Sequence, residues 1–355
     1  MARPHVSTRL RTVLGIVWLA VVAVVAVYVV NDRRAELAGI SKIFSHLNFS
    51  LLIPALILEC ASMAAYAQLQ RSVLAAGKVK SGFWRMLAIF LASNSINGVI
   101  PGGTAFSTVY SYRRFRDFGA SEGLSGWAIL AANVLAALSL FLLALVGLFV
   151  SEGSVSGISL TDSIVSVGAV LAAVLFVVAK ADLVTHWFSI LLVRLERRLG
   201  VTWKATKKVI QLEEEIRMIS PSRSRLTGAF GWGLFNWLFD ASVLLIAYFA
   251  TNSPIPFEGL LLAYSAGQLA ANFPITPGGL GVVEGSISIA LVAYGGNQEA
   301  SIAAVLLYRL LSFWIWLLPG ALSYVGLRIM KTDRHVVTGP VLLLEEVTDE
   351  QADAG

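Results

Sequence analysis

Residues 97–103 read NGVIPGG, and residues 272–284 read NFPITPGGLGVVE. Each segment interrupts an apolar stretch, the first running from Phe83 to Tyr112 and the second from Phe257 to Tyr294. Proline removes a backbone hydrogen bond and glycine disfavours the helix, so each Pro-Gly-Gly predicts a break between two short helices. The sequence therefore predicts two hairpins within hydrophobic segments.

The composition around these hairpins is that of a membrane protein. Of the 355 residues, 57% are hydrophobic and 14% are charged, and the mean hydropathy is +0.75. Because a soluble domain carries about 25% charged residues, this composition excludes a soluble enzyme, a disordered chain and a nucleic-acid-binding domain. The single cysteine, Cys60, cannot form an intramolecular disulfide.

Six further apolar runs are long enough to cross a hydrocarbon core of about 30 Å. They are Val13 to Val30, Leu51 to Leu69, Leu124 to Val150, Ser163 to Ala179, Gly228 to Ala250 and Ser301 to Leu327. The first run follows basic residues and has no convincing cleavage site, so we expect a retained signal anchor.

The basic residues indicate which loops face the cytoplasm. Residues 180–225 contain ten Lys and Arg, whereas 151–162 and 251–256 contain none. By the positive-inside rule, we expect both termini to be cytoplasmic in a multi-pass protein of the cell membrane, the inner membrane of a bacterium. Residues 31–50 disagree, because they must be external and yet carry Arg33, Arg34 and Lys42.

The first hairpin is predicted to be re-entrant. Its second limb, Thr104 to Tyr112, would be about 14 Å long, too short to recross the membrane. A full crossing would also leave Arg113, Arg114 and Arg116 outside. We therefore expect this hairpin to enter and leave from the cytoplasm with Pro101 near the middle of the membrane. The second hairpin would enter and leave from outside, although its length leaves two full spans open.

The two hairpins define an internal repeat. Pro101 and Pro277 are 176 residues apart, and Gly119 lies opposite Gly295 at the same offset. Each unit reads helix, broken hairpin, helix, and the charge distribution gives the units opposite directions. The expected fold is an all-α polytopic membrane protein with about six full transmembrane helices plus two re-entrant broken-helix hairpins in an inverted repeat, a plan typical of secondary transporters.

This reading divides the chain into five parts. They are a signal-anchor helix and external loop (1–50), a first repeat with its tip at 101–103 plus a linking helix (51–180), a cytoplasmic amphipathic connector (181–227), a second repeat with its tip at 277–279 (228–327) and a disordered cytoplasmic tail (328–355).

The hairpin tips carry the candidate substrate site. A half-helix begins after each Pro-Gly-Gly, and its first amides have no partner within the helix, so its N-terminus suits a phosphate group. The candidate substrate-binding residues are Asn97, Pro101, Gly102, Gly103, Thr104, Asn272, Thr276, Pro277, Gly278, Gly279, Gly281, Glu284 and Arg309.

Ionisable residues inside the apolar stretches are informative, because a charge at a helix centre costs about 2.5 to 3.5 kcal/mol. Arg309 either faces an anion or neutralises Glu284 or Asp240. Glu284 either pairs with Arg309 or carries a coupling proton. Glu59 and Asp240 are candidates for coupling groups or for a structural charge pair.

The motifs resemble those of a known family. Residues 272–284 are similar to the hallmark of the lysylphosphatidylglycerol synthase transmembrane family, also called flippase-like proteins. Residues 97–103 with Tyr112-Arg113-Arg114, and Tyr308-Arg309-Leu310 with Trp314 and Pro319, resemble its other motifs. In multiple peptide resistance factors, this membrane unit moves an aminoacylated phospholipid made by an attached aminoacyltransferase. Because the tail after Leu327 is too short for that enzyme, the resemblance implies lipid translocation without aminoacylation.

The sequence thus favours a transporter that moves a phospholipid, glycolipid or polyprenyl-phosphate head group between leaflets. We expect a membrane lipid with a phosphate head group as its partner, and no cofactor, metal, nucleic acid or enzymatic activity. No Gly-Lys-Ser/Thr loop or His-Glu-x-x-His motif is present. The alternatives are a membrane-embedded lipid-phosphate transferase and a noncatalytic partner of a separate lipid-modifying enzyme.

Overall fold

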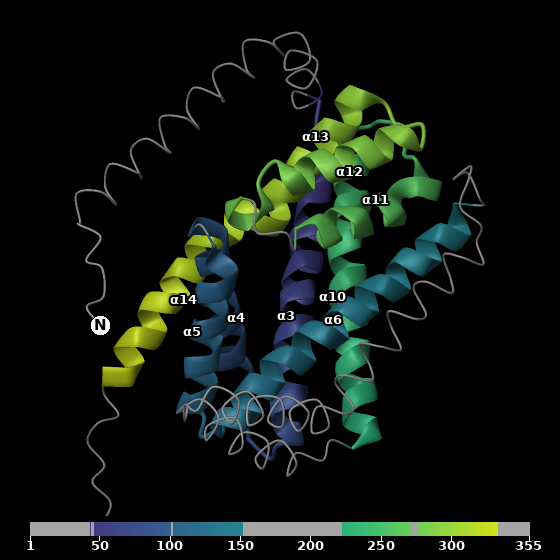
Figure 1. Ribbon diagram of the computed structural model, residues 1–355. Helices are drawn as coiled ribbons and strands as arrows, with labels where there is room; N and C mark the ends of the chain where they lie inside the picture. The colour runs from purple at the N-terminus through teal and green to yellow at the C-terminus, as the bar shows by residue number, and fades with distance from the viewer. Residues whose placement is uncertain (1–42, 44–45, 101, 152–221, 272–275, 333–355) are drawn as a thin grey trace, which may run out of the picture.

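The computed structural model describes residues 43, 46–100, 102–151, 222–271 and 276–332. These residues form helices joined by short loops, and they contain no strand (Figure 1). The all-helical, polytopic class predicted from the sequence is confirmed. The predicted spans Val13 to Val30 and Ser163 to Ala179, most of the connector and most of the tail lie outside the described residues.

Four segments of the described part are long and apolar enough to cross a membrane. They are α3 (Leu52–Ala76) with the 3₁₀ turn that precedes it, α6 (Glu122–Val150), α10 (Arg223–Ala250), and a composite of α13 (Gln298–Arg309), the π-helical turn η3 (Leu310–Trp314) and α14 (Ile315–Thr332). The start of α6 is fixed by Ser121, whose side chain accepts a hydrogen bond from the Leu124 amide at 3.1 Å. Each predicted run among these residues is therefore a helix.

The two broken stretches form helical hairpins. The first consists of α4 (Phe83–Val99) and α5 (Gly103–Asp117), and the second of α11 (Phe257–Ala270) and α12 (Val282–Ala293). These helices of 12 to 17 residues are about 18 to 26 Å long, shorter than a hydrocarbon core of about 30 Å. Both hairpins are thus too short for two full crossings, which resolves the alternative that the sequence left open for the second.

The second limb of the first hairpin is longer than predicted. Helix α5 continues past Tyr112 to Asp117, so Arg113, Arg114 and Arg116 extend the helix rather than follow it. No helix breaker occurs before Gly119, whose φ of 85° ends the segment in the left-handed region. The added length still leaves α5 short of a membrane span.

The two units run in opposite directions (Figure 1). Helix α3 descends in that view, and the hairpin α4–α5 begins and ends where α3 finishes. Helix α10 ascends, and the hairpin α11–α12 begins and ends at the other end of the molecule. The described helices therefore have the arrangement expected of an inverted repeat.

The units are interlocked by reciprocal contacts. Helices α3 and α10 pack along each other in the centre, while α4 packs on α14 and α11 packs on α6, so each hairpin contacts the last helix of the other unit. Glycines permit both approaches: Gly320 of α14 lies against the Leu91 carbonyl of α4, and Gly147 of α6 lies against Leu261 of α11. A hydrogen bond of 2.9 Å from Ser95 Oγ to the Leu317 carbonyl strengthens the first contact.

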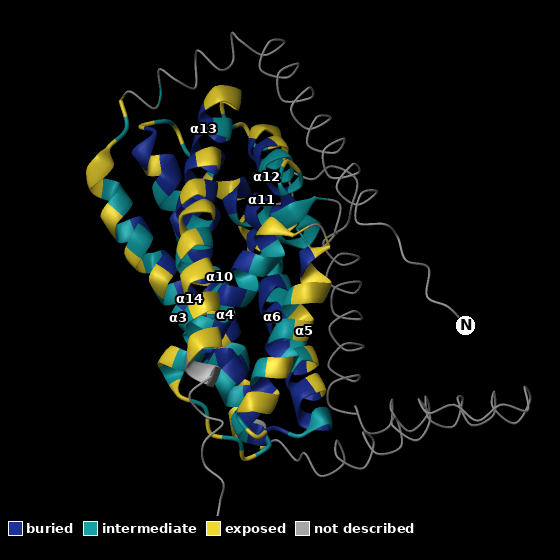
Figure 2. Ribbon diagram, turned by 90° about the vertical axis from the view of Figure 1, so that its left-hand side faces the viewer, coloured by how far each residue is buried: buried dark blue, intermediate teal, exposed yellow. Residues whose placement is uncertain are grey.

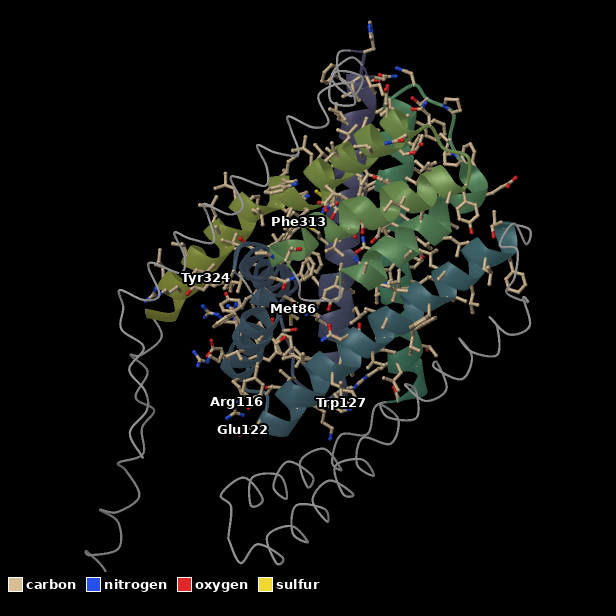
Figure 3. All side chains as sticks on the ribbon, turned by 45° about the horizontal axis from the view of Figure 1, so that its top comes forward. Met86, Arg116, Glu122, Trp127, Phe313 and Tyr324 are labelled. Carbon is tan, nitrogen blue, oxygen red and sulfur yellow. The ribbon has the colours of Figure 1, made fainter. Side chains whose placement is uncertain are left out.

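The surface separates into an apolar belt and a basic end. Large apolar side chains such as Ile53, Ile289 and Leu318 are exposed along the helices, as expected of a surface that faces lipid (Figure 2). Apart from Arg309, the Lys and Arg of the described residues belong to the loops and helix ends at the end of the molecule that holds Arg116 (Figure 3). This charge distribution agrees with the positive-inside argument.

Labelling of introduced cysteines will test this arrangement in a membrane. In a Cys60→Ala background, we expect Arg113→Cys and Asn297→Cys to react with a membrane-impermeant maleimide from opposite sides. Arg113 lies in the last part of the first hairpin and Asn297 follows the second, and the two hairpins enter from opposite ends. The measurement is labelling of sealed vesicles before and after permeabilisation. Labelling of both positions from one side would contradict the inverted arrangement.

Candidate functional site

The tips of the two hairpins meet at Phe313, a residue of the π-helical turn. The end of α4 contacts residues Pro277–Gly279 of the second tip. A Cβ atom added to Gly98 would lie 2.8 Å from Phe313 Cζ, and one added to Gly278 would overlap the same ring. The two hairpins therefore hold one aromatic ring between two glycines.

The π-helical turn places this ring and Arg309 at the tips. Such turns are rare and are frequently found at functional sites. A proline five residues further on, Pro319, cannot donate to the helix, and the Trp316 indole donates a 2.8 Å hydrogen bond to the Leu311 carbonyl. The missing donor at Pro319 and the hydrogen bond from Trp316 accommodate the wider π-helical turn at the place where the hairpins contact the last span.

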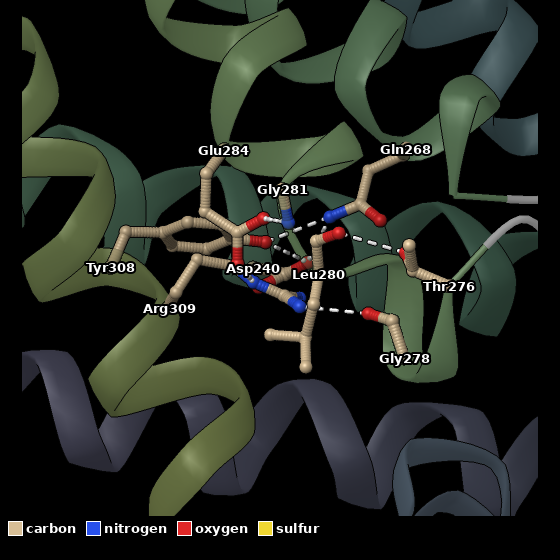
Figure 4. A network of polar contacts seen from close by, with 9 residues as sticks. All are labelled: Asp240, Gln268, Thr276, Gly278, Leu280, Gly281, Glu284, Tyr308 and Arg309. Carbon is tan, nitrogen blue, oxygen red and sulfur yellow. Dashed lines mark hydrogen bonds and ion pairs between the residues drawn. The ribbon is translucent and has the colours of Figure 1, made fainter. Parts of the chain in front are cut away.

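The second tip is closed by an ion pair (Figure 4). Arg309 donates from Nε to Glu284 Oε1 at 2.7 Å and from Nη2 to the Gly278 carbonyl at 2.8 Å. Its guanidinium carbon also lies 4.3 Å from the centre of the Phe313 ring. Of the alternatives considered for Arg309, the structure shows the pairing with Glu284.

The N-terminus of α12 is capped by the chain itself. Glu284 Oε2 accepts a 2.7 Å hydrogen bond from the Gly281 amide, so its carboxylate occupies the place where the sequence predicts an anionic ligand. The carboxylate thus bridges Arg309 and the start of the half-helix. Thr276 adds a 2.8 Å hydrogen bond from Oγ1 to the Leu280 carbonyl, which closes the turn of the tip.

The first tip is more open. Gly102 adopts a φ of 68° in the left-handed region, and Gly103 lies so close to Asn97 that a Cβ there would be 2.5 Å from its carbonyl oxygen. Thr104 Oγ1 donates a 2.9 Å hydrogen bond to Asn97 Oδ1. Gly102 and Thr104 are exposed. Pro101 and Asn272, also predicted for the site, lie outside the described residues.

A cluster of buried polar groups adjoins the ion pair. Asp240 Oδ2 of α10 accepts hydrogen bonds from Tyr264 Oη at 2.6 Å, Tyr308 Oη at 3.0 Å and Gln268 Nε2 at 3.1 Å. Glu59 of α3 lies against Asp240. Because Tyr308 immediately precedes Arg309 in α13, the carboxyl cluster and the ion pair are adjacent. Figure 4 shows two of these donors, Gln268 and Tyr308, beside Asp240.

Sequence reasoning did not select Tyr264, Tyr308 or Phe313 as site residues. An aromatic residue in an apolar stretch is ordinarily a packing residue, so composition gave no reason to choose them. Their positions relative to polar residues could have identified two of them. Tyr264 lies four residues before Gln268 on one face of α11, and Tyr308 adjoins Arg309.

An apolar groove opens beside Glu284, between α12 and α13. Its volume is about 490 Å³, and it is partly open to the surroundings. It is lined by Glu284, Gly285, Ser288, Ile289, Val292, Gln298, Ile302, Val305 and Leu306. The groove therefore joins a long apolar wall to one member of the buried ion pair.

The spans, the two broken hairpins and the intramembrane ion pair define a polytopic membrane protein with re-entrant helices. Residues 10–320 match the family model described as the lysylphosphatidylglycerol synthase TM region, and the chain belongs to this family. The family that the sequence motifs resemble is thereby confirmed.

Two relatives are similar over part of the chain. A UPF0104 membrane protein from Pyrococcus horikoshii is 24% identical over 135 residues, which are 38% of this chain and 39% of the relative. Another from Methanothermobacter thermautotrophicus is 26% identical over 136 residues, 38% of each chain. The matched segments thus span about two fifths of these relatives.

Substitution of the tip glycines will test the contact with Phe313. At Gly102, where φ is 68° and ψ is 22° and a Cβ would meet open space, alanine costs only the backbone strain of the left-handed region, about 1 to 2 kcal/mol. At Gly278, alanine also overlaps Phe313, so we expect about 1 to 3 kcal/mol more destabilisation. Thermal unfolding in detergent measures both variants. Equal losses of stability for Gly278→Ala and Gly102→Ala would contradict the contact. So would a loss for Gly278→Ala that is unchanged when Phe313→Leu is already present.

A double-mutant cycle will test the ion pair. The side chains of Arg309 and Glu284 are 8% and 17% exposed, and removal of one partner from a buried pair costs about 3 kcal/mol or more. We expect Arg309→Met and Glu284→Gln each to destabilise the protein, and the double variant to lose clearly less than their sum. The measurement is again thermal unfolding, and additive losses would exclude a direct interaction.

Proposed function

We propose that the protein moves the head group of a membrane lipid from one leaflet to the other. Membership of the lysylphosphatidylglycerol synthase TM family supports a role connected with membrane lipids. The cargo class that we propose is a phospholipid, a glycolipid or a polyprenyl phosphate. The lipid is the proposed partner of the protein, which acts in the cell membrane with both termini in the cytoplasm.

The groove between α12 and α13 carries this proposal. Ile289, Val292 and Leu306 give it apolar walls suited to an acyl or prenyl chain, and Glu284 gives it a polar end. Ile289 and Leu306 are exposed at the surface that faces lipid, so a chain could enter sideways from the bilayer. An amphiphile fits this combination better than a fully water-soluble solute does.

The ion pair suits a head group that carries charge. Arg309 and Glu284 present both signs with no net charge, and a zwitterionic or phosphate-containing group can exchange hydrogen bonds with either member. Phosphate would compete with Glu284 for Arg309, because a guanidinium binds both oxyanions with the same fork geometry. The head group would thus sit at the hairpin tips while its tails stay in the groove.

The reciprocal packing of the hairpins supports movement between two leaflets. Each hairpin rests on the last helix of the other unit, so rotation of one unit against the other would open the tips to one side and close them to the other. This is the alternating-access scheme of inverted-repeat transporters.

Filling the groove will test the proposal. Gly285 lines the groove, and a Cβ there meets open space. We expect Gly285→Phe to slow the movement of a fluorescent phospholipid about tenfold or more, because its ring would occupy the groove. A tenfold lower rate corresponds to a barrier raised by about 1.4 kcal/mol. The assay follows dithionite quenching in vesicles that contain the purified protein.

Two controls match this variant. Gly285→Ala adds only a methyl group, and Gly126→Phe adds the same ring to an exposed position of α6 where a Cβ also meets open space. Both should keep the wild-type rate. Wild-type vesicles that move none of a panel of phospholipids, glycolipids and polyprenyl phosphates would overturn the proposal. Product formation from a labelled lipid donor would favour the transferase, and copurification with a lipid-modifying enzyme would favour the noncatalytic partner.

A further inference from the structure

The seam between α3 and α10 buries two carboxyl groups against each other. Glu59 is 4% exposed and Asp240 is 8% exposed, and each carboxyl group is an electrostatic neighbour of the other. These helices belong to opposite units of the repeat. The pair therefore lies on the surface along which the two units would move.

One oxygen of each carboxyl group has no partner among the described residues. They are Glu59 Oε2 and Asp240 Oδ1, whereas Asp240 Oδ2 is saturated by Tyr264, Tyr308 and Gln268. A carboxylate accepts but cannot donate, so two ionised groups in contact leave both oxygens unsatisfied and repel each other. A proton placed between them would satisfy one oxygen on each side.

The other groups that surround the two carboxyl groups do not offset this repulsion. Tyr264 of α11 and Tyr308 of α13 face Asp240 as neutral donors, and Cys60 adjoins Glu59 on α3. The nearby cation, Arg309, is already bonded to Glu284 of α12. Among the described residues this region thus holds three carboxyl groups and one guanidinium, which is bonded to Glu284, and an unpaired charge here costs about 2.5 kcal/mol or more.

We propose that Glu59 and Asp240 hold one exchangeable proton between their carboxyl groups, and that its loss and uptake drive α3 and α10 apart and together. When the proton leaves to water, two like charges face each other across the seam between the units. When it returns, a carboxyl–carboxyl hydrogen bond joins them. No covalent bond changes, and the proton passes between the pair and bulk water.

The hydrogen bonds of Asp240 carry this change to the hairpin. Its other oxygen binds Tyr264 and Gln268 of α11 and Tyr308 of α13, so displacement of Asp240 pulls on the second hairpin and on the helix that carries Arg309. The coupling part of this inference rests on the proposed lipid movement, whereas proton binding does not.

Infrared difference spectroscopy tests proton binding directly. For purified protein in lipid nanodiscs, we expect a protonated-carboxyl band that titrates with pH in the wild type and disappears in Glu59→Gln and in Asp240→Asn. The amide of either variant resembles the protonated acid in shape, so both should fold, as size-exclusion chromatography will verify. Glu258→Gln, at an exposed position of α11, should leave the band unchanged. A band that persists in both variants, or one displaced by Na⁺ at constant pH, would overturn the inference.

Vesicles with an imposed pH gradient then test coupling. We expect the gradient to change the rate of phospholipid movement in the wild type by about tenfold, equivalent to 1.4 kcal/mol, and to have no effect in Glu59→Gln. A rate that ignores the gradient, in protein that does move lipid, would overturn the coupling while leaving the proposed function intact. A titrating carboxyl band in protein that moves no lipid would overturn the proposed function but would still support the proton site.

Discussion

Backbone groups at membrane depth must find partners within the protein, because lipid supplies none and each unpaired group costs several kcal/mol. The broken helices of this fold depend on how that requirement is met. Arg309 donates to the Gly278 carbonyl, and Glu284 accepts from the Gly281 amide. One buried ion pair therefore both neutralises its own charges and supplies the missing partners of an irregular loop.

The position of Phe313 joins both hairpins to the last span. Its ring lies against Gly98 and Gly278, one from each hairpin, and against the guanidinium of Arg309. Because the ring belongs to a π-helical turn in the last span, the geometry of that turn determines where the ring lies between the tips. The packing of both tips and the shape of one helix are thus linked.

The sequence predicted the elements that short-range rules control. Pro-Gly-Gly segments located both hairpins, apolar run lengths located the spans within the described residues, and basic residues gave the opposite directions of the units. The rules left open whether Arg309 pairs with Glu284 or with Asp240, and they did not predict that Tyr264 and Tyr308 meet Asp240, since these residues come from three different helices. The same rules predicted an anionic ligand at the start of α12. In the structure, the carboxylate of Glu284 accepts the hydrogen bond from the Gly281 amide there.

The crossed contacts of the hairpins have a consequence for either half of the chain on its own. Since α4 packs on α14 and α11 packs on α6, neither half contains the helix that covers its own hairpin. A half-length fragment would therefore need the missing half, or an oppositely oriented copy of itself, to bury that hairpin.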